Sequence, residues 1–130
     1  MIENIKDLIP KDKSDLFTAE KLKHYSYDDL KEIIPDLLEW LQDMNWPVAK
    51  TVSEYLLSIN DKITSELLPI LKSNKDEVWK YWIITVFGPV TQCPVIKNEI
   101  IRIAVSPTKN EKIEEVHEVA QEIMNSRNWK

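Results

Sequence analysis

The sequence predicts an all-α fold, a short right-handed α-solenoid of stacked helical hairpins of the HEAT or armadillo kind, with about six to eight helices. Three observations predict it. Apolar residues recur three and four positions apart along most of the chain, as on one face of a helix. Only one glycine occurs in 130 residues. Because β-hairpin turns usually need glycine, this scarcity disfavours a β-sheet protein. A similar pattern also returns after about 33 residues, which is typical of helical repeats.

The composition is that of one folded domain. Hydrophobic residues make up 43% and charged residues 30% of the chain, the balance of a globular protein. We therefore expect a single helical-repeat domain over residues 1–130. It is divided into an N-terminal arm at 1–17 and repeat units at about 27–59, 60–88 and 94–126.

Net charge, hydropathy and cysteine content limit the expected cellular compartment and the expected classes of binding partner. A net charge of −5 disfavours nucleic acid, because phosphate binding needs clustered Lys and Arg. The longest apolar run, residues 82–87, is far shorter than the roughly 20 residues of a membrane-spanning helix. Cys93 has no second cysteine to pair with, and the charged residues 1–7 do not resemble a signal peptide. These features predict a cytoplasmic protein that binds neither membranes nor nucleic acid.

Start signals mark the first helices. After the arm, Thr18 is expected to cap a short helix. Ser26 and Asp29 have the S-x-x-D spacing of a capping box, so the next helix begins there. A kink or break is expected at Pro35, because an interior proline removes a backbone hydrogen bond.

Three further helices are predicted in the middle of the chain. Asn45 is expected to cap a helix that carries Pro47 in its first turn. The next helix, over about 61–72, contains Pro69. Residues 76–87 carry too many apolar side chains for one stripe, so that helix is expected to be central and covered on several sides.

The C-terminal third follows a connector at Gly88. One helix is expected to end before Pro107. The last helix, over about 111–124, is amphipathic, with Ile113 on its apolar stripe and glutamates on the solvent side. His117 borders that stripe and is expected to be partly buried and hydrogen-bonded.

The repeat is clearest at two D-x-x-W tetrads. A shift of about 33 residues superposes Asp43 on Asp76 and Trp46 on Trp79. Hairpins with such a period bury their apolar faces by stacking on their neighbours. The period is shorter than the roughly 40–47 residues of HEAT and armadillo repeats, so "HEAT-like" describes the expected shape.

Two stretches carry a resemblance to a known family. They are LIPKDKSDL at residues 8–16 and LLEWLQDMNWPVA at residues 37–49. Both resemble a bacterial domain-of-unknown-function family of short HEAT-like helical proteins. The similarity covers about residues 8–88, and the C-terminal third looks less typical. The resemblance implies the fold and transfers no catalytic or ligand residues.

The paired aromatic and acidic residues of the repeat have two interpretations each. Trp46 and Trp79 either anchor a binding groove or fill the seam between hairpins, and seam packing is the simpler expectation for large aromatic side chains. Asp43 and Asp76 precede helices, so we expect them to help cap those helices rather than to form a catalytic pair.

Signatures of catalysis are missing from the sequence. No glycine-rich phosphate loop, G-x-S-x-G or H-E-x-x-H pattern occurs. The two histidines and the single cysteine are far apart in sequence, which gives a zinc site or a Cys-His pair little support. We therefore expect a protein that is not an enzyme and holds no metal or cofactor.

The sequence favours a non-catalytic protein–protein interaction module that presents a groove to another protein or peptide. An immunity-type protein that neutralises a basic toxin is a specific version, and a regulatory binding protein is another. The alternative is an enzyme or small-molecule-binding protein with an unrecognised site. The polar members of such a site are Asp43, Asn45, Lys50 and Tyr81.

The second helices of successive hairpins are expected to lie side by side and form the binding face. Lys50, Glu54, Lys80 and Glu115 are expected to point outward from it. The candidate binding residues are Asp43, Asn45, Trp46, Lys50, Glu54, Trp79, Lys80 and Tyr81.

Overall fold

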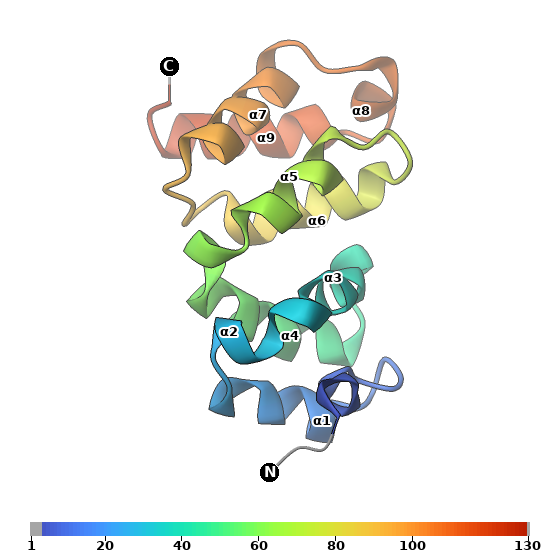
Figure 1. The fold of residues 1–130 in the computed structure, drawn as a ribbon. Coiled ribbons are helices and arrows are strands. Elements are labelled where there is room, and N and C mark those ends of the chain that lie inside the picture. The colour runs from blue at the N-terminus through green and yellow to red at the C-terminus, as the bar shows by residue number, and fades with distance from the viewer. Residues whose placement is uncertain (1–3, 130) are drawn as a thin grey trace.

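The structure is a computed structural model that describes residues 4–129. Among the residues that the structure describes, helix (3-10 turns included) accounts for 73%, and no strand occurs. The all-α prediction is confirmed. The helices follow one another from the N-terminus at one end of the molecule to the C-terminus at the other (Figure 1). None of the described helices is long and apolar enough to cross a membrane.

The chain begins with a 3-10 turn at Ile5–Leu8 and the short helix α1 at Leu16–Lys21. Residues 1–3 of the predicted arm lie outside the described residues. The predicted cap at Thr18 is wrong. Asp15 caps α1 instead, because its carboxylate accepts a hydrogen bond from the backbone N–H of Thr18, which is already inside the helix.

The next helical run is divided into short pieces. They are α2 (Tyr27–Leu30), a 3-10 turn (Lys31–Ile33), α3 (Ile34–Glu39) and a second 3-10 turn (Trp40–Gln42). Ser26 and Asp29 form the predicted capping box at the start of α2. The predicted break is also confirmed, since Pro35 lies in the first turn of α3, where its missing N–H costs little.

Helix α4 spans Pro47–Ser58, and Pro47 lies in its first turn as predicted. The predicted cap at Asn45 is wrong, because Trp46 occupies the N-cap position and makes no side-chain cap. Asp43 supports the preceding turn instead, as its Oδ1 accepts a hydrogen bond of 2.8 Å from the backbone N–H of Asn45. Asp43 therefore stabilises a turn and does not cap the helix.

Helices α5 (Thr64–Lys72) and α6 (Glu77–Phe87) form the middle of the molecule. Pro69 lies inside α5, as predicted. Asp76 caps α6 by accepting a 2.9 Å hydrogen bond from the backbone N–H of Trp79, which confirms its predicted role. Helix α6 contacts α4, α5 and α9, so it is the central helix that the sequence predicts.

Gly88 follows α6 at a point where a side chain has no room. A Cβ at this position would lie 2.5 Å from the carbonyl oxygen of Ile84 and 3.0 Å from Cγ1 of Ile123. The φ angle of Gly88 is −55°, an ordinary helical value. The glycine is therefore required because the carbonyl of Ile84 in α6 and the side chain of Ile123 both approach it closely, and not because of its φ angle.

The C-terminal third consists of α7 (Pro94–Val105), α8 (Lys109–Ile113) and α9 (Val116–Ser126). The predicted single helix over 111–124 is wrong, because the chain breaks at Glu115, which has a left-handed φ of 61°. The break puts α8 out of register with α9. Ile113, predicted on the apolar stripe, is consequently 62% exposed.

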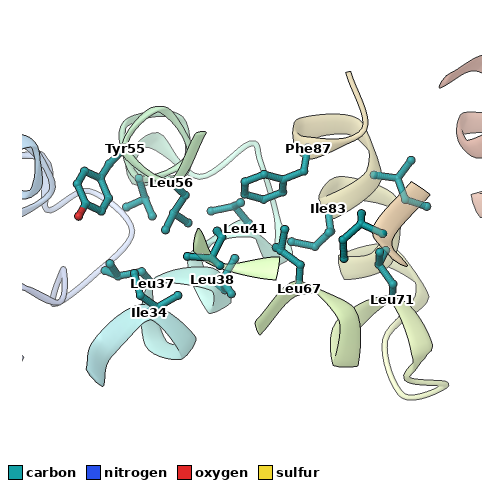
Figure 2. Close-up of a cluster of buried hydrophobic side chains, with 14 of the residues drawn as sticks. Ile34, Leu37, Leu38, Leu41, Tyr55, Leu56, Leu67, Leu71, Ile83 and Phe87 are labelled. Atoms are coloured by element: carbon teal, nitrogen blue, oxygen red, sulfur yellow. The ribbon is translucent and has the colours of Figure 1, made fainter. Parts of the chain in front are cut away.

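One core of buried hydrophobic side chains runs through the molecule, and its middle part is drawn in Figure 2. Side chains from α3 and α4 meet those from α5 and α6 there (Figure 2). All members of the first predicted apolar stripe are buried, at 0–1% exposure: Leu30, Ile33, Ile34, Leu37, Leu38 and Leu41. The helical periodicity of the apolar residues therefore predicts correctly which side chains are buried in this region.

Candidate functional site

An apolar cleft of about 360 Å³ lies between α3 and α5, beside the first turn of α6. Pro35 and Pro69 are both exposed and supply apolar rings from the two facing helices. The cleft is lined by Pro35, Leu38, Glu39, Ser65, Glu66, Pro69, Ile70 and Trp79. We call this site the α3–α5 cleft.

The sequence leaves two interpretations open for Trp79, and the surroundings of its side chain bear on both. Its indole Nε1–H donates a 3.0 Å hydrogen bond to the carbonyl oxygen of Leu38, which ties α6 to α3. The ring packs against the core, and it also lines the α3–α5 cleft. The side chain is half-buried, so it fills the seam and presents an aromatic surface to the cleft.

The rim of the cleft is negatively charged. Glu39 is exposed, and Glu66 accepts hydrogen bonds from the hydroxyl groups of Ser65 at 2.8 Å and Tyr27 at 3.5 Å. The lining residues include two carboxylates and no lysine or arginine. The site therefore combines an apolar interior with an uncompensated acidic edge.

The other candidate residues do not line this cleft. Trp46 packs edge-on against Trp40, with the ring centroids 5.6 Å apart, and Tyr81 packs in the same way against Trp82 at 5.1 Å. Trp46 and Tyr81 are both half-buried. Aromatic packing on neighbouring surfaces accounts for their positions.

The candidates on α4 and before it are spread over the surface. Lys50 and Glu54 are exposed on α4, and Glu54 lines a separate hollow of about 350 Å³ next to Tyr55. Asp43 and Asn45 lie in the turn before that helix. Of the eight candidate residues, only Trp79 lines the α3–α5 cleft.

The prediction that Lys80 points outward is wrong. Its side chain is only 2% exposed, with Nζ 2.7 Å from Oε2 of Glu111 and 2.9 Å from Oε1 of Glu77. Because α6 is covered on several sides, a lysine on it can be enclosed, and carboxylates then have to compensate its charge. Lys80 therefore belongs to a buried ion cluster.

Arg102 of α7 extends this buried cluster. Its guanidinium makes two hydrogen bonds to Glu111, of 2.6 and 2.9 Å, and contacts Glu99 at 2.6 Å. The Glu111 carboxylate also accepts a 2.8 Å hydrogen bond from the backbone N–H of Thr108, as part of the capping box of α8. One carboxylate thus joins α6, α7 and α8.

The environment of Glu111 shifts its protonation equilibrium. Burial of the carboxyl raises its pKa, but hydrogen bonds from Arg102, Lys80 and Thr108 outweigh burial and lower the pKa from 4.5 to about 2. The same contact with Glu111 raises the pKa of Arg102 further above its ordinary value, despite the opposing effect of burial. Glu111 and Arg102 are therefore both charged at neutral pH.

Two cations face three carboxylates in the cluster, so its net charge is −1. The carboxylate oxygens of Glu77 are buried and accept no hydrogen bond, although Oε1 forms the ion pair with Lys80. Nδ1 of His117 is likewise buried without a hydrogen-bond partner, so that part of the prediction for His117 is wrong. No group of three or more His, Cys, Asp or Glu among residues 4–129 is placed to hold a metal ion.

Sequence reasoning missed the cluster because its decisive contact joins residues 31 positions apart, Lys80 and Glu111. Local signals were present. Glu77 and Lys80, and likewise Glu99 and Arg102, have the i, i+3 spacing of helical ion pairs. Thr108 and Glu111 have the spacing of a capping box. None of these signals alone indicates burial.

Comparison with known proteins places the chain in one family. The family described as "Domain of unknown function (DUF5071)" matches residues 8–124, so the chain belongs to it. The match includes the C-terminal third, which extends the resemblance seen in the sequence beyond residue 88. No curated protein matches the chain.

Proposed function

We propose that this member of the DUF5071 family is a non-catalytic protein-interaction module that binds an amphipathic segment of another protein in the α3–α5 cleft. The observation that carries the proposal is an apolar cleft with a half-buried tryptophan and an acidic rim. Tryptophan is enriched among the residues that dominate binding energy at interfaces. Peptide segments in helical grooves are held mainly by apolar side chains, with polar groups around them.

The chemistry of the cleft defines the partner. A large apolar side chain of the partner packs between Pro35 and Pro69 and against the ring of Trp79. A lysine or arginine next to it in the partner pairs with Glu39 or Glu66 at the rim. The net charge of −5 supports the same choice, since it attracts basic partners and repels acidic ones.

We also propose that the helices form a short right-handed α-solenoid with units near 27–59, 60–88 and 94–126. The succession of α2–α4, α5–α6 and α7–α9 along the molecule supports this proposal (Figure 1). Contacts of α5 with α7 and of α6 with α9 support it as well. Solenoids commonly bind their partners along one continuous face.

An immunity-type protein of the cytoplasm remains the specific version of this proposal. Acidic immunity proteins mask basic toxins through complementary charge. Gene neighbourhood tests it at once. A toxin reading frame next to the gene in several relatives supports the immunity version, and its consistent absence contradicts it.

The cleft is tested by affinity capture from native cytosol, with partners identified by mass spectrometry. Ser65 is exposed and lines the cleft, so Ser65→Trp fills the cleft without disturbing the core. Glu39→Lys reverses the charge at the rim. Lys50→Glu on α4 is the matched control, because it changes a surface charge on the face that the sequence predicted for binding.

We expect the wild type and Lys50→Glu to recover the same partner, and Ser65→Trp and Glu39→Lys to lose it. Circular dichroism checks that all three variants remain folded. If Lys50→Glu loses the partner and Ser65→Trp retains it, the binding face is on α4 and the cleft proposal is wrong. A chain that captures no protein and binds a small molecule supports the alternative function.

A further inference from the structure

We propose that the partner presents an arginine to the α3–α5 cleft, an inference that rests on the function proposed above. The guanidinium group bridges the two helices at the rim, beside the apolar side chain that fills the cleft. Both helices offer acceptors: α3 the carboxylate of Glu39, and α5 the carboxylate of Glu66 and the carbonyl oxygen of Ser65. An arginine can reach several acceptors at once, because its planar fork carries five donors.

The carbonyl oxygen of Ser65 lacks the donor that a helix normally supplies. In α5 that donor is the backbone N–H of residue 69, and Pro69 has none. Ser65 and Pro69 are both exposed and both line the cleft, so the missing hydrogen bond lies on the side of α5 that faces it. Pro35 leaves no such gap in α3, because the carbonyl oxygen of Lys31 accepts a hydrogen bond from the backbone N–H of Ile34.

The two carboxylates at the rim have no cation of their own. Neither Glu39 nor Glu66 forms an ion pair with a lysine, arginine or histidine among residues 4–129. Glu66 accepts its side-chain hydrogen bonds from neutral hydroxyl groups, those of Ser65 and Tyr27. Hydrogen bonds between a guanidinium and a carboxylate are shorter and stronger than those between neutral groups. An arriving guanidinium therefore finds acceptors whose charge is not yet compensated.

The ring of Trp79 favours arginine over lysine. Elsewhere in the molecule, cations of the chain itself cover aromatic rings. Nζ of Lys21 lies 4.3 Å from the ring centroid of Phe17, and the guanidinium carbon of Arg127 lies 4.8 Å from a ring of Trp129. No lysine or arginine in the described part of the chain covers Trp79 in this way. A guanidinium stacks flat on an aromatic face and is more weakly hydrated than an ammonium group, so it is the better cation for this ring.

Three peptides that differ only in the head group test the proposal. They are acetyl-leucyl-arginine amide, its lysine analogue and its citrulline analogue, which keeps a planar head group and has no charge. Each is titrated into ¹⁵N-labelled full-length protein at low ionic strength. The indole N–H signal of Trp79, identified by its loss in Trp79→Phe, reports occupancy of the cleft. We expect the arginine peptide to bind about two- to fivefold more tightly than the lysine peptide, and the citrulline peptide to bind most weakly.

Variants assign the acceptors. Glu66→Gln removes a charge at nearly constant size and should weaken the arginine peptide about two- to fivefold. Pro69→Ala removes a ring and also restores an N–H for the carbonyl oxygen of Ser65. Pro35→Ala is its matched control, because it removes a ring and leaves the acceptors unchanged. We expect Pro69→Ala to weaken binding more than Pro35→Ala does, while Glu122→Gln, on the exposed surface of α9, should bind as the wild type does.

Equal binding of the arginine and lysine peptides, or of the arginine and citrulline peptides, overturns the inference. Equal effects of Pro69→Ala and Pro35→Ala overturn the bridge to Ser65. Indole shifts that persist in Ser65→Trp also contradict it, because that variant fills the cleft. The proposed function is decided separately, by whether Ser65→Trp loses the partner captured from cytosol. If that partner is lost and the peptides do not discriminate, the cleft binds its partner without an arginine.

Discussion

Trp79 and Lys80 are neighbours on α6, and each holds a different junction of the fold together. Trp79 joins α6 to α3 through one hydrogen bond and an apolar ring that stays half exposed. Lys80 joins α6 to α8 through ion pairs at 2% exposure. The apolar junction tolerates contact with water, whereas the ionic junction has to be complete, because Lys80, Glu77 and Glu111 stay buried when one of them loses its partner.

The largest expected effect comes from breaking the ionic junction. Lys80→Ala leaves the carboxylates of Glu77 and Glu111 buried with fewer cations. We expect the free energy of unfolding to fall by about 3–5 kcal/mol, the usual cost of removing one partner of a buried pair. Chemical denaturation measures it. Lys72→Ala, an exposed lysine on α5, should stay within about 0.5 kcal/mol of the wild type; equal effects of the two variants would mean that the cluster contributes nothing.

Acid should weaken the ionic junction selectively. The pKa of Glu111 is about 2 in the folded protein and 4.5 as its ordinary value. Because the folded value is the lower one, this carboxylate stabilises the fold fully above pH 4.5 and loses its contribution as the pH falls toward 2. The pKa difference corresponds to about 3 kcal/mol.

The free energy of unfolding, measured from pH 6 down to pH 2 for the wild type and for Glu111→Gln, checks this effect. The variant has no ionisable group at position 111. The wild type should lose about 3 kcal/mol more stability than the variant across this range. Parallel curves for the two proteins contradict the low pKa.

Breaking the apolar junction should lower the free energy of unfolding by less than breaking the ionic junction. Trp79→Ala removes a half-buried ring and its hydrogen bond, so we expect about 2–3 kcal/mol, below the 3–5 kcal/mol of a tryptophan removed from a fully closed core. Trp79→Phe keeps an aromatic ring and lacks the indole N–H, and should cost about 1 kcal/mol. Both values come from denaturation midpoints. A larger loss for Trp79→Ala than for Lys80→Ala reverses the ranking of the two junctions.

The smallest effect concerns the break that leads from α8 into α9. Glu115 is held at a left-handed φ of 61°, which costs a side-chain-bearing residue about 1–2 kcal/mol. Glu115→Gly should therefore raise the free energy of unfolding by about 0.5 kcal/mol, after the greater flexibility of glycine in the unfolded chain is subtracted. A destabilised variant shows that the glutamate side chain itself supports the break.

The comparison also shows which parts of the fold can be predicted from sequence. Periodic apolar residues from Leu30 to Leu41 are all buried, because the helical period determines which face meets the core. The capping box at Ser26 and the helix start at Pro47 depend on nearest neighbours, and both are confirmed. The break at Glu115 carries no proline or glycine signal, so the sequence predicts a continuous helix there.

The candidate site is less predictable than the fold. The D-x-x-W pattern in the sequence indicates Trp79 as a candidate residue. The cleft that Trp79 lines also requires Pro35 and Pro69, which come from two different helices. Lys80 is expected on the surface because a charged residue alone gives no sign of its distant partner. Partners such as Glu111 become visible only when the packing of α6 against the C-terminal helices is known.

The buried cluster gives the molecule an uneven response to heat. The hydration of charged groups becomes less favourable as the temperature rises, so the cost of keeping Lys80 and Glu111 away from water falls. The apolar contacts around Trp79 gain no comparable benefit. On warming, the α6–α8 junction therefore retains more of its strength than the α3–α5 region. Amide hydrogen exchange just below the melting temperature should accordingly be faster in α3 than in the first turns of α6.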